Sequence, residues 1–175
     1  DEMKSVLLIR HGQSVFNEKM DLFFDNNADE KFAVEDDPYE WWERRDHYDP
    51  FTVDAKLTKK GIDQAVDVGN KIKDLKIDLF VVSPLQRCLE TFENIFKVKK
   101  DDRTKNVILN PLASERVNSS CDVGSSIVTL KKKFPRFDFS SLKEGSNWHA
   151  ALSGSSCYED KFCVVPNMSP PKVME

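Results

Sequence analysis

The chain has 175 residues, of which 39% are hydrophobic and 32% charged, so its size and composition fit a single domain over residues 1–175 with a buried core. Its formal net charge is −4 and it carries no long basic block, which argues against nucleic acid and anionic membrane as partners. No apolar run reaches membrane-spanning length, and the four cysteines form no CxxC pair, which is typical of reduced thiols in a cytoplasmic protein.

The first predicted element is a buried strand from Ser5 to Arg10, because "VLLI" is a short and continuous apolar run. Residues 19–50 then form an insertion that is acidic and rich in aromatic side chains. A long insertion of this kind is either a lid over a functional site or a satellite cluster under a surface loop.

Two helices and two further strands follow the insertion. A helix is predicted over Leu57 to Leu75, capped by Thr58, with one buried stripe made of Ile62, Ala65, Val66, Gly69 and Ile72. A strand over Asp78 to Ser83 leads into a helix that begins at Pro84, and its stripe consists of Leu85, Cys88, Leu89, Phe92, Ile95 and Phe96. A third strand is predicted over Asn106 to Leu112.

Strands that alternate with amphipathic helices indicate βαβ units. We therefore expect an α/β fold of three α/β/α layers around a mainly parallel sheet. A short helix over Ile127 to Phe134 ends at Pro135, and residues 153–175 form an atypical, turn-rich tail.

Polar side chains follow all three predicted strands, and ligands of open α/β sheets bind beyond the carboxyl ends of the strands. The candidate site residues in chain order are Arg10, His11, Gly12, Ser14, Asn17, Arg87 and Glu115. Two arginines at one place indicate an oxyanion such as phosphate, because a guanidinium group matches phosphate geometry with two parallel hydrogen bonds. A phosphorylated small molecule is therefore the expected ligand.

Each of the other candidates has a chemical role at such a site. Gly12 lets the backbone approach a ligand closely, and Ser14 and Asn17 either donate to the phosphate oxygens or cap the turn that follows them. A neutral His11 with one ring nitrogen held by a backbone carbonyl can attack phosphorus. Glu115 either donates a proton to the leaving oxygen or forms a surface ion pair with the neighbouring Arg116.

Four ordered segments resemble one family. "RHGQSVFNE" is similar to the RHGxSxxN signature of the histidine phosphatase superfamily, in its phosphoglycerate-mutase-like branch. "DAKLTKKGIDQA", "VVSPLQRCLET" and "SERVNSSCDVG" resemble later segments of that family in the same order. The resemblance implies a phosphohistidine intermediate on His11, with phosphate held by Arg10, Asn17 and Arg87, Glu115 as the acid, and neither a metal nor another cofactor.

The late part of the chain departs from this family pattern. Family members bring a second histidine into the pocket at the end of a late strand, but here the late apolar run Phe162 to Val165 is followed by Pro166, and His149 follows no strand. Either the fold is incomplete at its C-terminus, through replacement or removal of that segment, or the pocket lacks one of its cations.

The sequence therefore predicts an enzyme, a phosphomonoester hydrolase that acts through a phosphohistidine on His11. Phosphoryl transfer of the phosphoglycerate-mutase type is one alternative. The other is a catalytically impaired relative that binds a phosphoester or a protein, and it follows from the lack of a second pocket histidine.

Overall fold

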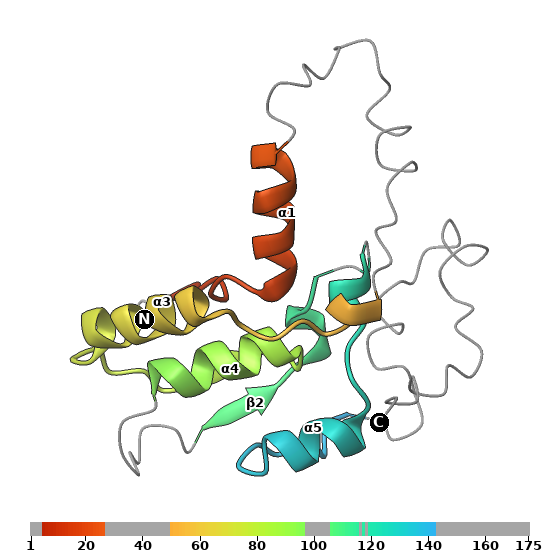
Figure 1. Cartoon of the computed structure of the whole chain (residues 1–175). Helices are drawn as coiled ribbons and strands as arrows, with labels where there is room; N and C mark the ends of the chain where they lie inside the picture. Colours follow the sequence, from red (N-terminus) through yellow and green to blue (C-terminus); the bar gives the residue numbers. More distant parts are fainter. Residues whose placement is uncertain (1–4, 27–49, 97–105, 116, 118, 143–175) are drawn as a thin grey trace.

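The computed structural model describes residues 5–26, 50–96, 106–115, 117 and 119–142, which are coloured in Figure 1. Its elements in chain order are α1 (Val15–Asn26), η1 (Pro50–Thr52), α3 (Lys59–Ile72), β1 (Phe80–Val82), α4 (Gln86–Ile95), β2 (Val107–Leu109), η3 (Pro111–Ala113), η4 (Ser120–Asp122) and α5 (Ile127–Lys133). Helix α1 takes up the first residues of the predicted insertion. Residues 27–49, the tail, His149 and the run from Phe162 to Val165 lie outside the described residues. None of the described helices is long and apolar enough to span a bilayer.

The two strands and the helix between them form a parallel βαβ unit. Strand β1 pairs with β2 in parallel, with Val82 opposite Leu109, and α4 connects the two strands. This confirms the α/β class and the parallel pairing. Val82 and Leu109 are buried, whereas Val81 and Ile108 on the alternate positions are exposed, so the apolar runs are buried on one face of the sheet.

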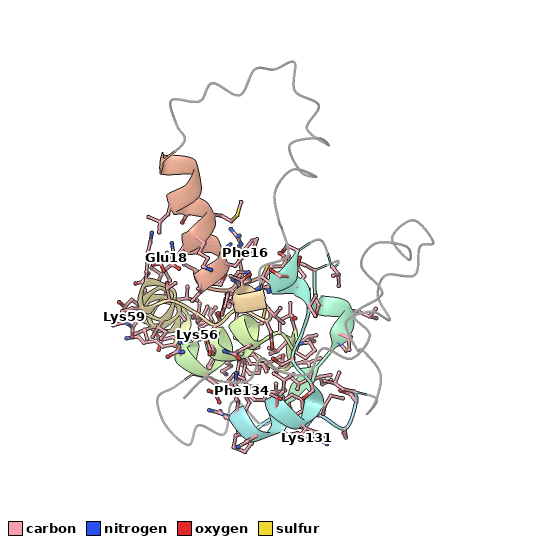
Figure 2. The ribbon with its side chains drawn as sticks, turned by 45° about the vertical axis from the view of Figure 1, so that its right-hand side comes forward. Phe16, Glu18, Lys56, Lys59, Lys131 and Phe134 are labelled. Carbon is pink, nitrogen blue, oxygen red and sulfur yellow. The ribbon has the colours of Figure 1, made fainter. Side chains whose placement is uncertain are left out.

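The hydrophobic core lies around this unit. Figure 1 shows β2 between α4 and α5, and both helices contribute to one buried cluster. The predicted stripe of α4 is confirmed, since Leu85, Leu89, Phe92 and Ile95 are buried while Cys88 and Phe96 pack partly buried against the core. At the end of α5, Phe134 is buried in the core, while Lys131 lies on the outer side of the helix (Figure 2).

Helix α3 begins as predicted, because the Thr58 side chain accepts a hydrogen bond from the Gly61 amide. It packs along α4, as Figure 1 shows, and Gly69 lies against the backbone of Ile95 at the end of α4. The buried residues of α3 are Ala65 and Gly61, of which Gly61 lies against the backbone of Gln13. The predicted stripe is wrong at Val66, which is exposed. One residue advances a helix by about 100°, so Val66 cannot share the face that Ala65 turns toward α4.

The strand predicted over Ser5 to Arg10 is absent from the structure. The described sheet contains β1 and β2 only, and residues 5–10 pair with neither strand. Their apolar side chains are exposed, to 83% for Val6 and 88% for Leu8. A continuous apolar run forms a buried strand only where neighbouring strands supply hydrogen bonds and other elements cover both faces, and this segment has neither within the described part of the chain.

Candidate active site

The turn that carries His11 is anchored to α3 and α4. The Gly12 amide donates to the hydroxyl oxygen of Thr91 at 3.1 Å, and the Thr91 hydroxyl donates to the backbone carbonyl of Arg87 at 2.7 Å. Gly12 also lies against the backbone of Gly61, and a Cβ added at Gly12 would stand 2.3 Å from the Gly61 carbonyl oxygen. Only a residue without a side chain fits this contact, which explains the glycine that follows the histidine.

The imidazole of His11 is fixed in one tautomer. Its Nδ1 lies 2.7 Å from the carbonyl oxygen of Gly12. A carbonyl oxygen can only accept a hydrogen bond, so Nδ1 carries the proton and Nε2 keeps its lone pair. Burial lowers the pKa of His11, and the positive charges of Arg87 and Arg10 lower it further against the opposing effects of the Gly12 carbonyl and Glu115. The ring is therefore held neutral, with Nε2 free to act as a nucleophile.

The guanidinium group of Arg87 is buried at the start of α4, with 2% of the residue exposed. Its Nη1 donates to the carbonyl oxygen of Cys121, and its Nη2 donates to Glu115 at 3.1 Å and to Asp122 at 3.0 Å. Its Nε–H is buried and has no acceptor among the described residues. This Nε–H thus remains for a group that is not part of the described chain.

Glu115 and Asp122 share this arginine in very different settings. The Glu115 side chain is 64% exposed, whereas that of Asp122 is 5% exposed. Asp122 also accepts hydrogen bonds from the amide and the hydroxyl of Ser119, both at 3.1 Å. The predicted ion-pair partner of Glu115 was Arg116, which lies outside the described residues, and the partner found is Arg87.

Ser14 and Asn17 form a reciprocal cap at the start of α1. The Ser14 amide and hydroxyl donate to Oδ1 of Asn17 at 3.0 and 2.9 Å, and the Asn17 amide donates to the Ser14 hydroxyl at 3.2 Å. The capping alternative for these two residues is thus present in the structure. Ser14 is buried, whereas Asn17 lines a cavity beside His11.

That cavity has a volume of about 510 Å³ and lies between the His11 turn, α1 and α3. Arg10, His11 and Asn17 line it on one side, and Lys60 and Gln64 line it from α3. Arg87 and Glu115 are not part of its lining. The structure thus brings Arg10, His11 and Asn17 to one cavity, while Arg87 and Glu115 form a neighbouring ion-pair cluster whose charges act on His11.

Sequence reasoning missed two residues of this arrangement. Thr91 follows Arg87 by one helical turn, and that spacing places both on one face of α4. Asp122 stands three residues after Ser119, and a serine followed three residues later by an acidic side chain is the pattern of a capping box, which η4 contains. Among the described residues, no cluster of three His, Cys, Asp or Glu side chains could hold a metal ion.

Comparison with known proteins shows which family the chain resembles, independently of the structure. The family model of the histidine phosphatase superfamily (branch 1) matches residues 40–138, a range that includes Arg87, Glu115 and Asp122. A probable phosphatase of Schizosaccharomyces pombe is 32% identical over 93 residues, which are 52% of this chain and 43% of that protein. The 2,3-bisphosphoglycerate-dependent phosphoglycerate mutases of Chlamydia felis and Chlamydia abortus are each 35% identical over 89 residues, 51% of this chain and 27% of the mutase. The chain spans less than half the length of these relatives.

Proposed function

Because the chain belongs to the histidine phosphatase superfamily (branch 1), we propose that it is a phosphomonoester hydrolase with His11 as the nucleophile. The observation that carries the proposal is the hydrogen bond from Nδ1 of His11 to the Gly12 carbonyl. This bond leaves the lone pair on Nε2, and the lowered pKa keeps the ring unprotonated near neutral pH.

In the first step, Nε2 of His11 attacks phosphorus, and the bond from phosphorus to the ester oxygen breaks as the nitrogen–phosphorus bond forms. Glu115 delivers the proton that the leaving alcohol oxygen takes up. In the second step, water attacks the phosphohistidine and gives a proton to the Glu115 carboxylate. The nitrogen–phosphorus bond then breaks and releases inorganic phosphate.

The phosphate group is held during both steps by Arg10, Asn17 and Arg87. The Nε–H of Arg87, which has no acceptor among the described residues, supports this role, because a buried donor without an acceptor is costly unless a ligand supplies one. Asn17 and Arg10 line the cavity next to His11. Ser14 takes part by holding Asn17 through the cap of α1.

Phosphoryl transfer between phosphoglycerates is the second candidate, because two of the relatives carry the name phosphoglycerate mutase. The two reactions share the phosphohistidine and differ in its acceptor, which is water for the hydrolase and a second alcohol for the mutase. Incubation with 3-phosphoglycerate separates them, since hydrolysis releases inorganic phosphate and transfer yields 2-phosphoglycerate.

The central test is covalent labelling. After reaction with a radioactive phosphate donor, we expect a label that is labile in acid and stable in base, and we expect His11→Ala to remove both the label and the turnover of p-nitrophenyl phosphate. His149→Ala is the matched control and should keep the label. A well-folded wild-type chain that takes up no label would refute the mechanism. If phosphate then protected that chain against thermal unfolding without turnover, the function would be binding of a phosphoester.

A further inference from the structure

The proposed function assigns no role to Asp122, the buried carboxylate that is paired with Arg87. Asp122 lies in η4, remote in sequence from the motifs that carry His11 and Arg87, and its carboxylate is almost fully buried. Its Oδ1 accepts from Nη2 of Arg87, while its Oδ2 accepts from the amide and the hydroxyl of Ser119. Each carboxylate oxygen thus faces a different donor set.

This arrangement fixes the guanidinium plane of Arg87 from one side. Nη1 donates to the backbone carbonyl of Cys121, and Nη2 donates to the side chain of the following residue, Asp122. A planar guanidinium held at both terminal nitrogens has a defined direction for its Nε–H. Glu115 also binds Nη2, but its side chain is largely exposed, so it is free to leave the arginine during a reaction cycle.

We propose that Asp122 is a positioning residue that holds Arg87 in the orientation needed to bind the phosphate group. This inference rests on the proposed function and assigns the orientation of its buried cation to a residue outside the catalytic set. Asp122 acts through Arg87 and touches no substrate. Ser119 in turn fixes Asp122 through the capping box of η4.

Substitution of Asp122 by asparagine tests this geometry with little change in volume. Arg87 and Ser119 face different oxygens of the carboxylate, and asparagine replaces one of these oxygens by a donor NH₂ group, so it cannot accept at both positions. We expect Asp122→Asn to weaken binding of inorganic phosphate, measured by titration calorimetry, by about tenfold, the factor that corresponds to the loss of one hydrogen bond to a charged group. Asp138→Asn is the matched control, because Asp138 is exposed and its carboxylate binds Ser140.

Measuring the effect of Asp122→Asn on phosphate affinity in a second variant, Arg87→Lys, distinguishes positioning of Arg87 from a purely structural role of Asp122. In an Arg87→Lys chain the guanidinium fork is gone, so Asp122→Asn should change phosphate affinity there by less than about twofold. Ser119→Ala keeps the carboxylate but loosens it, and it should weaken phosphate binding in the same direction by a smaller factor. If Asp122→Asn does not fold, Ser119→Ala decides the question.

The outcomes distinguish the two proposals. A folded Asp122→Asn or Ser119→Ala chain with wild-type phosphate affinity would overturn the positioning role and leave the proposed function intact. An equal loss in the Arg87→Lys background would also overturn it. Phosphate binding without turnover in the wild type would refute hydrolysis alone. A wild-type chain that binds no phosphate would remove the proposed function and this inference together.

Discussion

Gly61→Ala should impair the His11 turn while leaving the fold largely intact. Gly61 lies in the first turn of α3, and a Cβ added there would stand 2.1 Å from the backbone carbonyl oxygen of Gln13. Ordinary contact begins at 3.4 Å, so the turn and the helix must separate by about 1.3 Å. The obstructing atom is backbone and cannot swing aside. Because Gln13 follows His11 by two residues, the displacement reaches the nucleophile.

The magnitude follows from two opposing effects on stability and one on activity. Overpacking costs about 1–3 kcal/mol of unfolding free energy, whereas alanine is favoured over glycine in a helix by about 1 kcal/mol. The net loss of about 0–2 kcal/mol leaves a protein of ordinary stability folded. A misplacement of about 1 Å at a reacting group costs about a hundredfold in rate. We therefore expect turnover of p-nitrophenyl phosphate to fall by about a hundredfold.

Gly69→Ala is the matched control on the same helix. A Cβ there would stand 2.4 Å from the backbone carbonyl oxygen of Ile95, so the clash is of the same kind. Gly69 lies about 12 Å further along α3, at the contact with the end of α4. Both variants should lose similar stability in urea unfolding, and Gly69→Ala should keep its activity within about twofold. Equal activity losses in the two folded variants, or none in Gly61→Ala, would refute the reasoning.

Three further predictions concern the anchor, the nucleophile and the core. Thr91→Val should cost about 1–3 kcal/mol in urea unfolding, because the buried Gly12 amide loses its acceptor, and Thr91→Ser should restore most of this. Because the protonated ring cannot attack and the pKa of His11 is lowered, the acidic limb of a kcat/KM profile should lie below pH 6.5. An acidic limb above pH 6.5 would contradict a neutral nucleophile. Leu130→Ala should lose about 2–5 kcal/mol of unfolding free energy, because Leu130 is fully buried, whereas the exposed Val128→Ala should change it by less than about 0.5 kcal/mol.

The same depressed pKa gives the stability of the chain a pH dependence of fixed sign. The unfolded chain takes up a proton on His11 near pH 6.5, whereas the folded chain does so only at lower pH. Between these two values the unfolded state binds more protons, so stability falls as the pH falls through this window and this contribution is constant above it. His11→Gln, which cannot titrate, should lack this part of the dependence.

The helices were predictable because their signals are local. The stripe of α4 and the Thr58 cap of α3 each depend on residues within a few positions of one another, and both were confirmed. The stripe of α3 failed at Val66, which is exposed, whereas the buried residues of this helix are the small Gly61 and Ala65 and its close approach to α4 is at Gly69. A hydrophobicity pattern alone does not distinguish a large apolar residue at the edge of a contact from one inside it.

The strand predicted over Ser5 to Arg10 failed for a different reason. Its apolar composition favours burial, but a strand also needs a neighbouring strand as a hydrogen-bond partner. The neighbours of parallel strands come from distant parts of the sequence. β1 and β2, which α4 connects, form hydrogen bonds with each other. Residues 5–10 have no partner strand within the described residues. The local pattern predicted a buried strand, and the structure shows neither the strand nor the burial.

The site was predictable to the extent that its residues follow strands or open helices. Arg87 was predicted as a candidate because it opens a helix, and His11 because it follows the strand expected over Ser5 to Arg10, which the structure does not form. The charge of Arg87 acts on His11 in the structure. Asp122 was missed because its partner Arg87 lies 35 residues away in the sequence, and no pattern within η4 indicates that its carboxylate pairs with that arginine. A buried arginine is costly unless an acidic side chain is buried beside it, so the burial of Arg87 implies a buried carboxylate from elsewhere in the chain.

If the proposed function holds, the charge balance around His11 explains why an arginine directly precedes the histidine. Arg87 is already paired with Asp122 and Glu115, so its net charge available to a phosphate dianion is small. Arg10 forms no ion pair among the described residues and lines the cavity beside His11, so it supplies the unbalanced positive charge. The two arginines thus divide the work: Arg87 offers a fixed donor direction, and Arg10 offers charge.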